Sequence, residues 1–457
     1  MRSLCLSLVS VWILILLSGA CITRDVSQVV PEPAREELTD IPVDLNRDLD
    51  ILFVIDNSGS MEREHVSLAL EFPRIIQALD LDGLGLPSLH VGVITTDLGA
   101  GSACASGDGG NLINTGQNCM GPSGAFIEDL ANEDGSRTRN FSGTLEDTFS
   151  CIAQVGATGC GFEQPLEALR RALDNNPNNA GFLRDHAYLA VVIVTDEDDC
   201  SATDTGLFDL APVDLSSPLG PPVSFRCFEF GVECEGDDPR APGTKENCVP
   251  RADSPYLRDV DEYSSFLRGV KPFSQQVLLA TISGALGPVR VDRVDDPRFE
   301  FQVAELAKSC ETANGEAVPP IRLQTALANV GVPVKQASIC QGDLTEAVSE
   351  IAEFFAVATN FCVNGNLSDS DPSTPELDLE CSVTELAIDS SGAHHERVLP
   401  SCDNLLDPKT SSRLPCYTML PAADCESTPT GLRLEVHYAD GVTVPPLTRA
   451  VAACNAD

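Results

Sequence analysis

One carboxylate and two hydroxyls stand at alternate positions after the first apolar run of the mature sequence, as Asp56, Ser58 and Ser60. A later apolar run, Tyr188–Thr195, leads directly into Asp196. Ligands of open parallel sheets bind outside the carboxyl ends of the strands, so side chains that follow two neighbouring strands can meet there. Carboxylate and hydroxyl oxygens suit a hard divalent cation. We therefore expect a metal site that takes Mg²⁺, with Ca²⁺ or Mn²⁺ as alternatives.

A structural alternative exists for the same residues. Ser and Asp at a strand-to-helix turn commonly cap the helix that follows, and Asp196 alone could be an ordinary turn carboxylate. The next residues, Glu197, Asp198 and Asp199, are expected in a solvated acidic loop, in which one could serve as an outer-shell ligand. The chain contains neither a G-x-S-x-G nucleophile elbow nor a G-x-x-x-x-G-K phosphate loop.

The elements that must position these side chains can be predicted from apolar patterning. Four runs rich in Val, Ile and Leu do not alternate with polar residues, as is typical of strands buried on both faces of a parallel sheet. These runs are Ile51–Ile55, Leu89–Thr95, Tyr188–Thr195 and Val277–Ser283. Helical patterns cover Ser60–Leu79 (with a kink or break expected at Pro73), Gln164–Leu173, Phe301–Ala313 and Leu344–Ala358. The alternation predicts an α/β fold, a doubly wound and mostly parallel sheet flanked by helices.

Two polar stretches interrupt the alternation of strands and helices, and the composition changes near the C-terminus. Residues 99–143 are rich in Gly, Asn and Ser, and residues 201–269 hold three cysteines among Pro, Gly and Asp, so both are expected to be insertions into a domain spanning 46–358. Residues 359–457 contain six cysteines and short β-like runs. This segment is predicted to be a small, disulfide-rich C-terminal domain.

The two strand ends carry a family resemblance. FVIDNSGSM, at 53–61, resembles the D-x-S-x-S motif of the von Willebrand factor type A domain, and VVIVTDEDD, at 191–199, resembles that family's later strand ending in a metal-site Asp. The resemblance runs from about Leu45 to Ala358 and leaves out both insertions and the C-terminal domain. It implies a metal-ion-dependent adhesion site, in which Asp56, Ser58, Ser60 and Asp196 hold the cation and an acidic side chain of a partner completes its coordination.

The family pattern also calls for a Thr in the loop before a later helix. Thr158 lies in that loop, but counting back from the helix places Glu163 in the Thr slot. A direct Glu ligand would add negative charge and favour a structural or more tightly held cation. Glu163 is favoured, and Thr158 remains a candidate.

The N-terminus has the layout of an exported protein. Residues 1–20 combine an early Arg, an apolar run and a small-residue end, which is typical of a signal peptide. Leu-Ser-Gly-Ala-Cys resembles a bacterial lipoprotein box with Cys21 as the lipidated residue, although that box usually carries Leu where this chain has Ser18. Residues 21–45 are then expected to be a tether. Without lipidation the protein would be periplasmic or secreted.

The cysteines fit an oxidising compartment. Of 18 cysteines, Cys5 leaves with the leader and Cys21 takes the lipid, so sixteen remain for up to eight disulfides, whose connectivity the sequence leaves open. There is no C-x-x-C, and only six His occur, so zinc-site spacing is absent.

Charge excludes some classes of function. With 29 Lys and Arg against 69 Asp and Glu, the formal net charge is −40, which argues against nucleic-acid binding and against docking on anionic lipid. We expect a lipoprotein of the outer membrane or cell surface, held to the membrane only by its lipid, that mediates divalent-metal-dependent protein binding or adhesion. A structural envelope scaffold with a closed metal site is the alternative. A metal-assisted hydrolase is disfavoured because no general base accompanies the site.

Overall fold

The structure is a computed structural model that describes most of the chain after residue 37. The described residues are 38–44, 47–80, 85–101, 103–104, 107–116, 119–132, 134–211, 214–236, 238–312, 315–359, 361–363, 365, 367, 380–388, 393–426, 428–439, 441–442, 444 and 447–455. The predicted signal peptide, Cys5, Cys21 and most of the predicted tether lie outside them.

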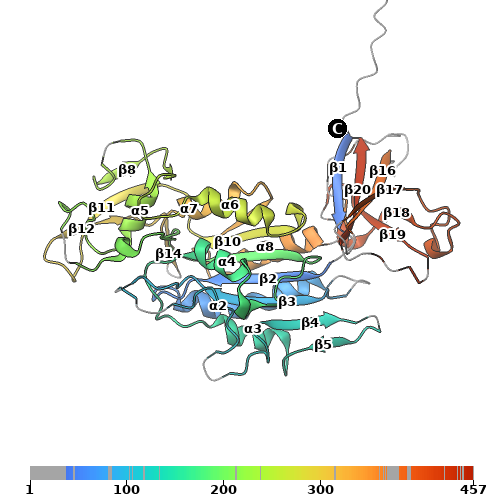
Figure 1. Ribbon diagram of the computed structural model, residues 1–457, viewed down its shortest axis with the longest axis horizontal. Helices are drawn as coiled ribbons and strands as arrows, with labels where there is room; N and C mark the ends of the chain where they lie inside the picture. The colour runs from blue at the N-terminus through green and yellow to red at the C-terminus, as the bar shows by residue number, and fades with distance from the viewer. Residues whose placement is uncertain are drawn as a thin grey trace, which may run out of the picture.

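A seven-stranded sheet forms the centre of the larger domain, in the order β15-β10-β6-β2-β3-β4-β5 (Figure 1). Five strands are parallel, namely β2 (Leu49–Ile55), β3 (Leu89–Thr95), β6 (Tyr188–Val194), β10 (Val277–Ser283) and β15 (Val334–Ser338). Two antiparallel strands, β4 (Ile127–Ala131) and β5 (Arg137–Arg139), extend one edge. The first four parallel strands are buried at every position, as the unbroken apolar runs predict.

Helices cover both faces of this sheet. On one face lie α2 (Glu62–Leu79), α3 (Leu145–Ala153) and α8 (Thr345–Thr359), and on the other lie α4 (Pro165–Leu173), α6 (Val260–Gly269) and α7 (Ile321–Ala328). Because successive side chains of a strand point to opposite faces, Phe53 packs with the first layer and Leu52 with the second. The predicted α/β, doubly wound fold class is confirmed.

Two helix predictions differ from the structure. Phe301–Ala313 is not helical, since Gln302–Leu306 forms strand β12 and Cys310–Glu311 forms β13. Its apolar residues pack on α5 (Phe225–Gly231) of the insertion, a long-range contact that the local pattern does not reveal. The predicted break at Pro73 is absent, since α2 runs continuously through this exposed residue.

The two predicted insertions contribute more than loops. Residues 99–143 supply β4 and β5 to the central sheet, and 201–269 ends in α6, which belongs to the core. The rest of the second insertion contains α5, β7 (Val232–Glu233), β8 (Gly243–Lys245) and β9 (Val249–Pro250). Strand β8 joins β11 (Val289–Asp295) and β12 in a three-stranded sheet, here called the arm sheet. A short hairpin follows, formed by β13 and β14 (Glu316–Ala317).

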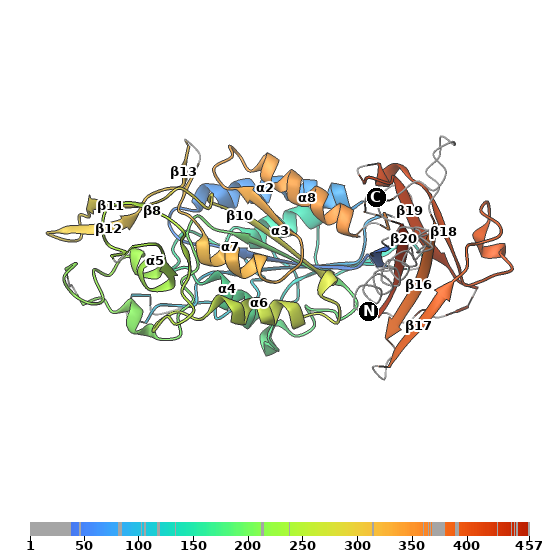
Figure 2. The same cartoon turned by 90° about the horizontal axis from the view of Figure 1, so that it is seen from above.

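The C-terminal domain is built from β-strands. One sheet has the order β1-β20-β16-β17, formed by β1 (Leu38–Asp44), β20 (Leu447–Asn455), β16 (Cys381–Ile388) and β17 (His394–Leu399). A second has β18 (Cys416–Pro421) paired with β19 (Leu432–His437). Leu38–Asp44 was expected in the tether of residues 21–45, but it pairs antiparallel with β20 and so belongs to this domain. The domain and the arm sheet lie at opposite ends of the molecule (Figure 2).

Disulfides staple both domains and the insertion. Sixteen cysteines form eight bridges, as the cysteine arithmetic allows. They are 104–160, 119–151, 200–227, 234–248, 310–340, 362–425, 381–454 and 402–416.

Short 3-10 helices occur at Pro177–Asn179, Thr205–Phe208, Ser274–Gln276, Pro408–Thr410 and Ala423–Cys425. Among the described residues, no helix is both long and apolar enough to cross a membrane.

Candidate metal centre

The turn after β2 gathers three of the predicted ligands. Asp56 is fully buried, and its Oδ1 accepts the backbone N–H of Ser58 at 2.8 Å. The hydroxyls of Ser58 and Ser60 lie 3.0 Å apart. The other oxygen of Asp56 accepts the hydroxyl of Thr195 at 2.8 Å. The turn thus places one carboxylate and two hydroxyls together.

The helix-capping interpretation of these residues is wrong. Helix α2 begins at Glu62 with Met61 as its N-cap, and no side chain makes a capping hydrogen bond there. The ring of His65, which is 3% exposed, instead hydrogen-bonds the carbonyl oxygen of Asp56 at 2.6 Å through Nε2. The side chains of Ser58 and Ser60 are therefore not used to begin the helix.

Asp196 lies beside this turn because β2 and β6 are adjacent and in register at their carboxyl ends. Ile55 is opposite Val194, and the backbone N–H of Asp56 donates to the carbonyl of Val194 at 2.9 Å. Asp196 is 6% exposed, and its Oδ1 has no hydrogen-bond partner. Burial raises the pKa of Asp196, and a hydrogen bond with Ser60 opposes that rise. The structure therefore brings Asp56, Ser58, Ser60 and Asp196 together.

The two loop candidates differ in their surroundings. Thr158 is exposed, although its loop is fastened to the turn by the N–H of Gly159, which donates to the carbonyl of Asn57 at 2.8 Å. A Cβ at Gly159 would lie 2.1 Å from the side-chain oxygen of Asn57, so a larger residue there would displace the Asn57 side chain. Glu163 is 1% exposed, and its Oε1 has no hydrogen-bond partner. The geometry thus favours Glu163 over Thr158 as a group that faces the buried centre.

Backbone bonds explain why Glu163 lies there. The carbonyl of Glu163 accepts the N–H of Cys200 at 2.7 Å, and the next residue, Gln164, donates its N–H to the carbonyl of Thr96 at 3.0 Å. Glu163 is therefore held between the ends of β3 and β6.

Electrostatics distinguishes this centre from an ordinary polar turn. Burial, followed by the charge of Asp196, raises the pKa of Asp56 to about 8. Burial, followed by the same charge, raises the pKa of Glu197 to about 7. Burial and then the charges of Glu197 and Asp56 raise the pKa of Glu163. These shifts share one cause, the crowding of acids in a place of low polarity.

Within the described part of the chain, none of these four carboxylates is in an ion pair. The ammonium of Lys308 lowers the pKa of both Asp196 and Glu197, but it is paired with Glu316 at 3.1 Å. Carboxylates that form no ion pair, together with orphaned buried oxygens on Asp196 and Glu163, fit a divalent cation. No group of three or more His, Cys, Asp or Glu is arranged to hold a metal among the described residues. A cation here would accordingly depend on the serine hydroxyls and on ligands from outside the chain.

Glu197 is a member of this acidic group that the sequence did not single out. It was expected in a solvated loop, but its carboxyl is hydrogen-bonded to that of Glu163. The signal available in the sequence was its position directly after Asp196, at the end of a strand buried on both faces.

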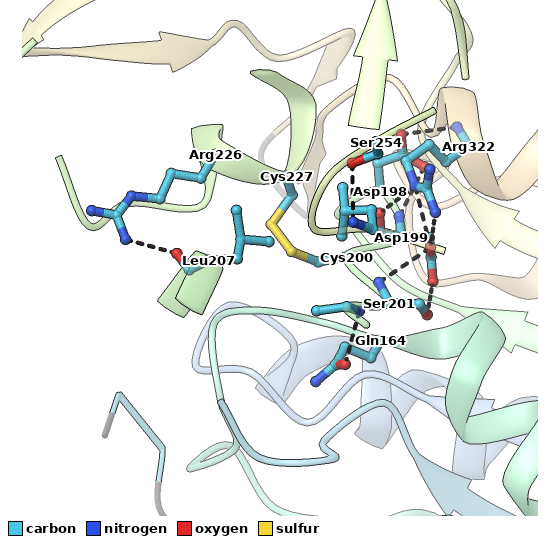
Figure 3. Close-up of a disulfide and its surroundings, with 12 residues drawn as sticks. Gln164, Asp198, Asp199, Cys200, Ser201, Leu207, Arg226, Cys227, Ser254 and Arg322 are labelled. Atoms are coloured by element: carbon cyan, nitrogen blue, oxygen red, sulfur yellow. Dashed lines mark hydrogen bonds and ion pairs between the residues drawn. A yellow bond between two sulfur atoms is a disulfide. The ribbon is translucent and has the colours of Figure 1, made fainter. Parts of the chain in front are cut away.

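The neighbouring Asp198 and Asp199 were expected to be solvated, and the structure gives them a structural role instead. Asp198 accepts the N–H groups of Arg322 and Leu323 at 2.9 Å each, in the first turn of α7. Asp199 is fully buried, forms an ion pair with Arg322 at 3.1 Å and accepts the N–H of Leu166 in α4 (Figure 3). These two carboxylates therefore dock helices and are not free to bind a cation.

Cys200, which follows Asp199, links the second insertion to the segment after β6. Cys200 is bridged to Cys227 of α5 (Figure 3). The hydroxyl of Ser201 accepts the N–H of Glu167. The strand end that carries Asp196 is thus tied covalently to the insertion.

Comparison with known proteins gives only weak structural similarity. No family model matches the chain, and no curated protein sequence matches it. Solved structures with similar backbones include a von Willebrand factor type A protein from Catenulispora acidiphila (TM-score 0.28, 10% identity, 92% of this chain and 61% of that one). They also include the pilus adhesin RrgA from Streptococcus pneumoniae (0.30, 11%, 91% and 57%) and proximal thread matrix protein 1 from the mussel byssus (0.28, 11%, 70% and 48%). This chain spans less than two thirds of the length of each. TM-scores and sequence identities this low support no conclusion about function. A functional proposal must therefore rest on the geometry of the site.

Proposed function

We propose that this chain binds a protein partner through a divalent cation, Mg²⁺ in the first instance, held by Asp56, Ser58, Ser60 and Asp196. The observation that carries the proposal is the pair of buried carboxylates at two adjacent strand ends, neither of which forms an ion pair with a described residue, since the nearby Lys308 is paired with Glu316. Isolated buried charges are costly, and a cation that neutralises them would stabilise the folded state.

The ligand set favours binding over catalysis. Asp56, Ser58, Ser60 and Asp196 can fill only part of the coordination sphere of Mg²⁺, so a position remains that an acidic side chain of a partner can enter. Ser60 is exposed, which opens the centre on that side. Hydrolysis would need a positioned base and a held water, and the nearest imidazole, His65, is buried and bonded to the backbone of Asp56. We infer that the chain is not an enzyme.

The arrangement of the domains suits a surface protein. The candidate metal centre lies at the carboxyl ends of the strands, where the arm sheet is, whereas β1 lies in the C-terminal domain at the other end (Figures 1 and 2). A chain anchored to a membrane through Cys21 would therefore present its metal-binding end outward. We propose an exported protein of the cell surface, in which the lipid is the only membrane attachment.

The test is metal-dependent capture. The purified chain, immobilised on beads, is incubated with solubilised envelope and surface proteins in 5 mM Mg²⁺ or in EDTA, beside Asp56→Ala and the exposed neighbour Glu62→Gln. A partner held by wild type and Glu62→Gln in Mg²⁺, and released by EDTA and by Asp56→Ala, supports the proposal. Capture that is identical for all three proteins and in both buffers contradicts it.

The buried position of Glu163 favours a second candidate, a structural scaffold with a closed metal site. If Glu163 binds the cation directly, its carboxylate occupies the position that a partner would take. Glu163→Thr would then open the site. A variant that gains metal-dependent capture absent from wild type would establish the closed scaffold, and unchanged capture would exclude it.

A further inference from the structure

Two adjacent leucines lie on the surface of the C-terminal domain. Leu405 is 50% exposed and Leu406 is 100% exposed. They belong to residues 403–415, between β17 and β18, here called the leucine loop, whose ends are joined by the disulfide of Cys402 and Cys416. Single exposed apolar residues are ordinary on a soluble protein, but neighbouring ones in one loop indicate a surface that contacts an apolar partner.

Hydrogen bonds within the leucine loop hold these side chains in place. The Oδ1 of Asn404 accepts the N–H groups of Leu406 and Asp407 at 3.2 Å each, and its amide donates to the hydroxyl of Thr410 at 2.8 Å. The hydroxyl of Thr410 in turn donates to the carbonyl of Asp407 at 2.8 Å. Because the N–H of Leu406 is bonded within the loop, it would not be left without a partner on entering an apolar phase.

The leucine loop has no net charge, although the chain is strongly acidic. Its charged residues are two of each sign, Asp403, Asp407, Lys409 and Arg413, whereas the whole chain has a formal charge of −40. The loop carries too little positive charge to select anionic lipid. Charges of both signs suit zwitterionic headgroups, which present both a phosphate and an ammonium group.

The leucine loop is in the part of the molecule that a lipid on Cys21 would keep near the membrane. Strand β1 begins at Leu38, which is 38 − 21 = 17 residues after Cys21. A chain of this length reaches at most about 60 Å. The loop belongs to the same domain as β1, and Figure 2 shows the chain between β17 and β18 projecting from this domain on the side away from the larger domain.

We propose that the leucine loop contacts the membrane, with Leu405 and Leu406 entering the boundary between headgroups and acyl chains of a zwitterionic bilayer. This inference rests on the proposed function, in which the chain is anchored at the cell surface. The lipid remains the attachment, since two side chains bury less apolar surface than one acyl chain, which itself binds only marginally. The loop fixes how the C-terminal domain meets the bilayer, so that the metal centre faces outward.

Tryptophan fluorescence tests this contact. The single tryptophan of the sequence, Trp12, lies in the predicted signal peptide, so Leu406→Trp gives the mature chain one reporter. Leu70→Trp is the matched control, at a 71% exposed position on α2 of the larger domain. Both variants, purified with the N-terminal lipid, are reconstituted into phosphatidylcholine vesicles with ordinary or brominated acyl chains, since bromine quenches tryptophan only at close range.

We expect the emission of Leu406→Trp to shift to the blue in vesicles and to be quenched by bromine, most strongly by bromines placed about 5–10 Å below the headgroups. The emission of Leu70→Trp should be the same in both kinds of vesicle. Both variants should melt at the temperature of wild type, with and without Mg²⁺, which verifies that the exchanges leave the fold and the metal centre intact.

Three results would overturn the inference while leaving the metal function standing. The first is emission of Leu406→Trp that brominated lipid does not change. The second is equal quenching of both variants, which would show that the added tryptophan adsorbs wherever it is placed. The third is a blue shift of Leu406→Trp that grows with protein concentration without vesicles, because a second copy of the chain would then cover the loop.

Mass spectrometry of the mature N-terminus tests the anchor separately. If Cys21 carries no lipid, the proposed anchoring fails, and the same two variants are mixed with an excess of vesicles. Quenching of Leu406→Trp alone would still support the leucine loop as a membrane contact, and quenching of neither variant would overturn it.

Discussion

Each end of strand β2 has a buried carboxylate, but only the one at the amino end forms ion pairs with described residues. At the amino end, Asp50 is fully buried and is met by Arg184 at 2.7 Å and by Lys271 at 3.2 Å, whose side chain is also fully buried. At the carboxyl end, Asp56 is equally buried but its hydrogen bonds come from a backbone N–H and from uncharged hydroxyls, and its charged neighbours are other acids.

The difference shows at which end the chain supplies the counter-charge of its buried carboxylate. The chain supplies two cations to Asp50, so that end is a closed structural network. It supplies none of the described cations to Asp56 as an ion-pair partner, so neutralisation there must come from protons or from an added cation. Substitutions at the two ends should therefore affect stability differently.

The largest effect is expected from Lys271→Met. Leaving a buried charge without a partner costs about 3–5 kcal/mol, and because Arg184 still meets Asp50 at 2.7 Å the loss here should lie near the lower end, about 3 kcal/mol. Calorimetry should show a marked fall in the melting temperature, by the same amount in Mg²⁺ and in EDTA. The exposed Lys409→Met serves as the control and should melt as wild type does. A Lys271→Met variant as stable as wild type would show that Asp50 does not need this partner.

Asp56→Asn should behave in the opposite way. The substitution removes a buried acid that has no counter-charge, so in EDTA the melting temperature should be equal to or above that of wild type. In Mg²⁺ at 100 times its dissociation constant, wild type should gain about 2.7 kcal/mol and the variant nothing. Thermal denaturation in both buffers measures the two values. A variant that melts well below wild type in EDTA would mean that the Asp56 carboxylate is already compensated.

Stability should also depend on pH at the carboxyl end. The pKa of Asp56 rises from 3.8 to about 8 and that of Glu197 from 4.5 to about 7 in the folded state. An acid with a raised folded-state pKa binds its proton more tightly when folded, so it favours folding at low pH, and that contribution is lost as the pH rises through this window. In EDTA the melting temperature should fall between about pH 4 and pH 8.

Mg²⁺ should flatten this dependence, because the cation replaces the protons as the pH rises. Asp56→Asn should flatten it in EDTA as well. Melting curves at intervals across the range test both statements. Equal slopes in Mg²⁺ and in EDTA would indicate that these carboxyls do not bind the ion.

The smallest effects distinguish the two loop candidates. Glu163→Gln keeps the shape of a buried side chain and removes its charge, and we expect Mg²⁺ affinity to fall about tenfold. Thr158→Ala alters an exposed hydroxyl and should change it less than twofold. Calorimetric titration with Mg²⁺ compares them. The reverse order would make Thr158 the loop ligand.

Much of the fold could be predicted because it depends on local patterns. The four unbroken apolar runs predicted the buried strands, since only a sheet covered on both faces accepts them. Strand β12 and strand β1 could not be predicted in this way. The first is defined by contacts with α5 and the second by pairing with β20, and both partners are distant in sequence.

In the candidate site, too, some features follow from local sequence and others depend on distant contacts. Asp56 and Asp196 follow strands, so the end of a sheet brings them together whatever lies between them in sequence. The roles of Glu197 and Asp199 depend on residues distant in sequence. Asp199 forms an ion pair with Arg322 of α7, and Glu197 is hydrogen-bonded to Glu163. A run of four adjacent acids therefore separates into two at the open centre and two that dock helices.

The most direct test of the central claim is calorimetric titration of Mg²⁺ into metal-free wild type and Asp56→Asn at pH 7.5. Wild type should bind the ion, with protons released from the carboxyls of raised pKa, and Asp56→Asn should bind none at the same concentrations. Binding of equal affinity to both proteins, or to neither, would contradict it.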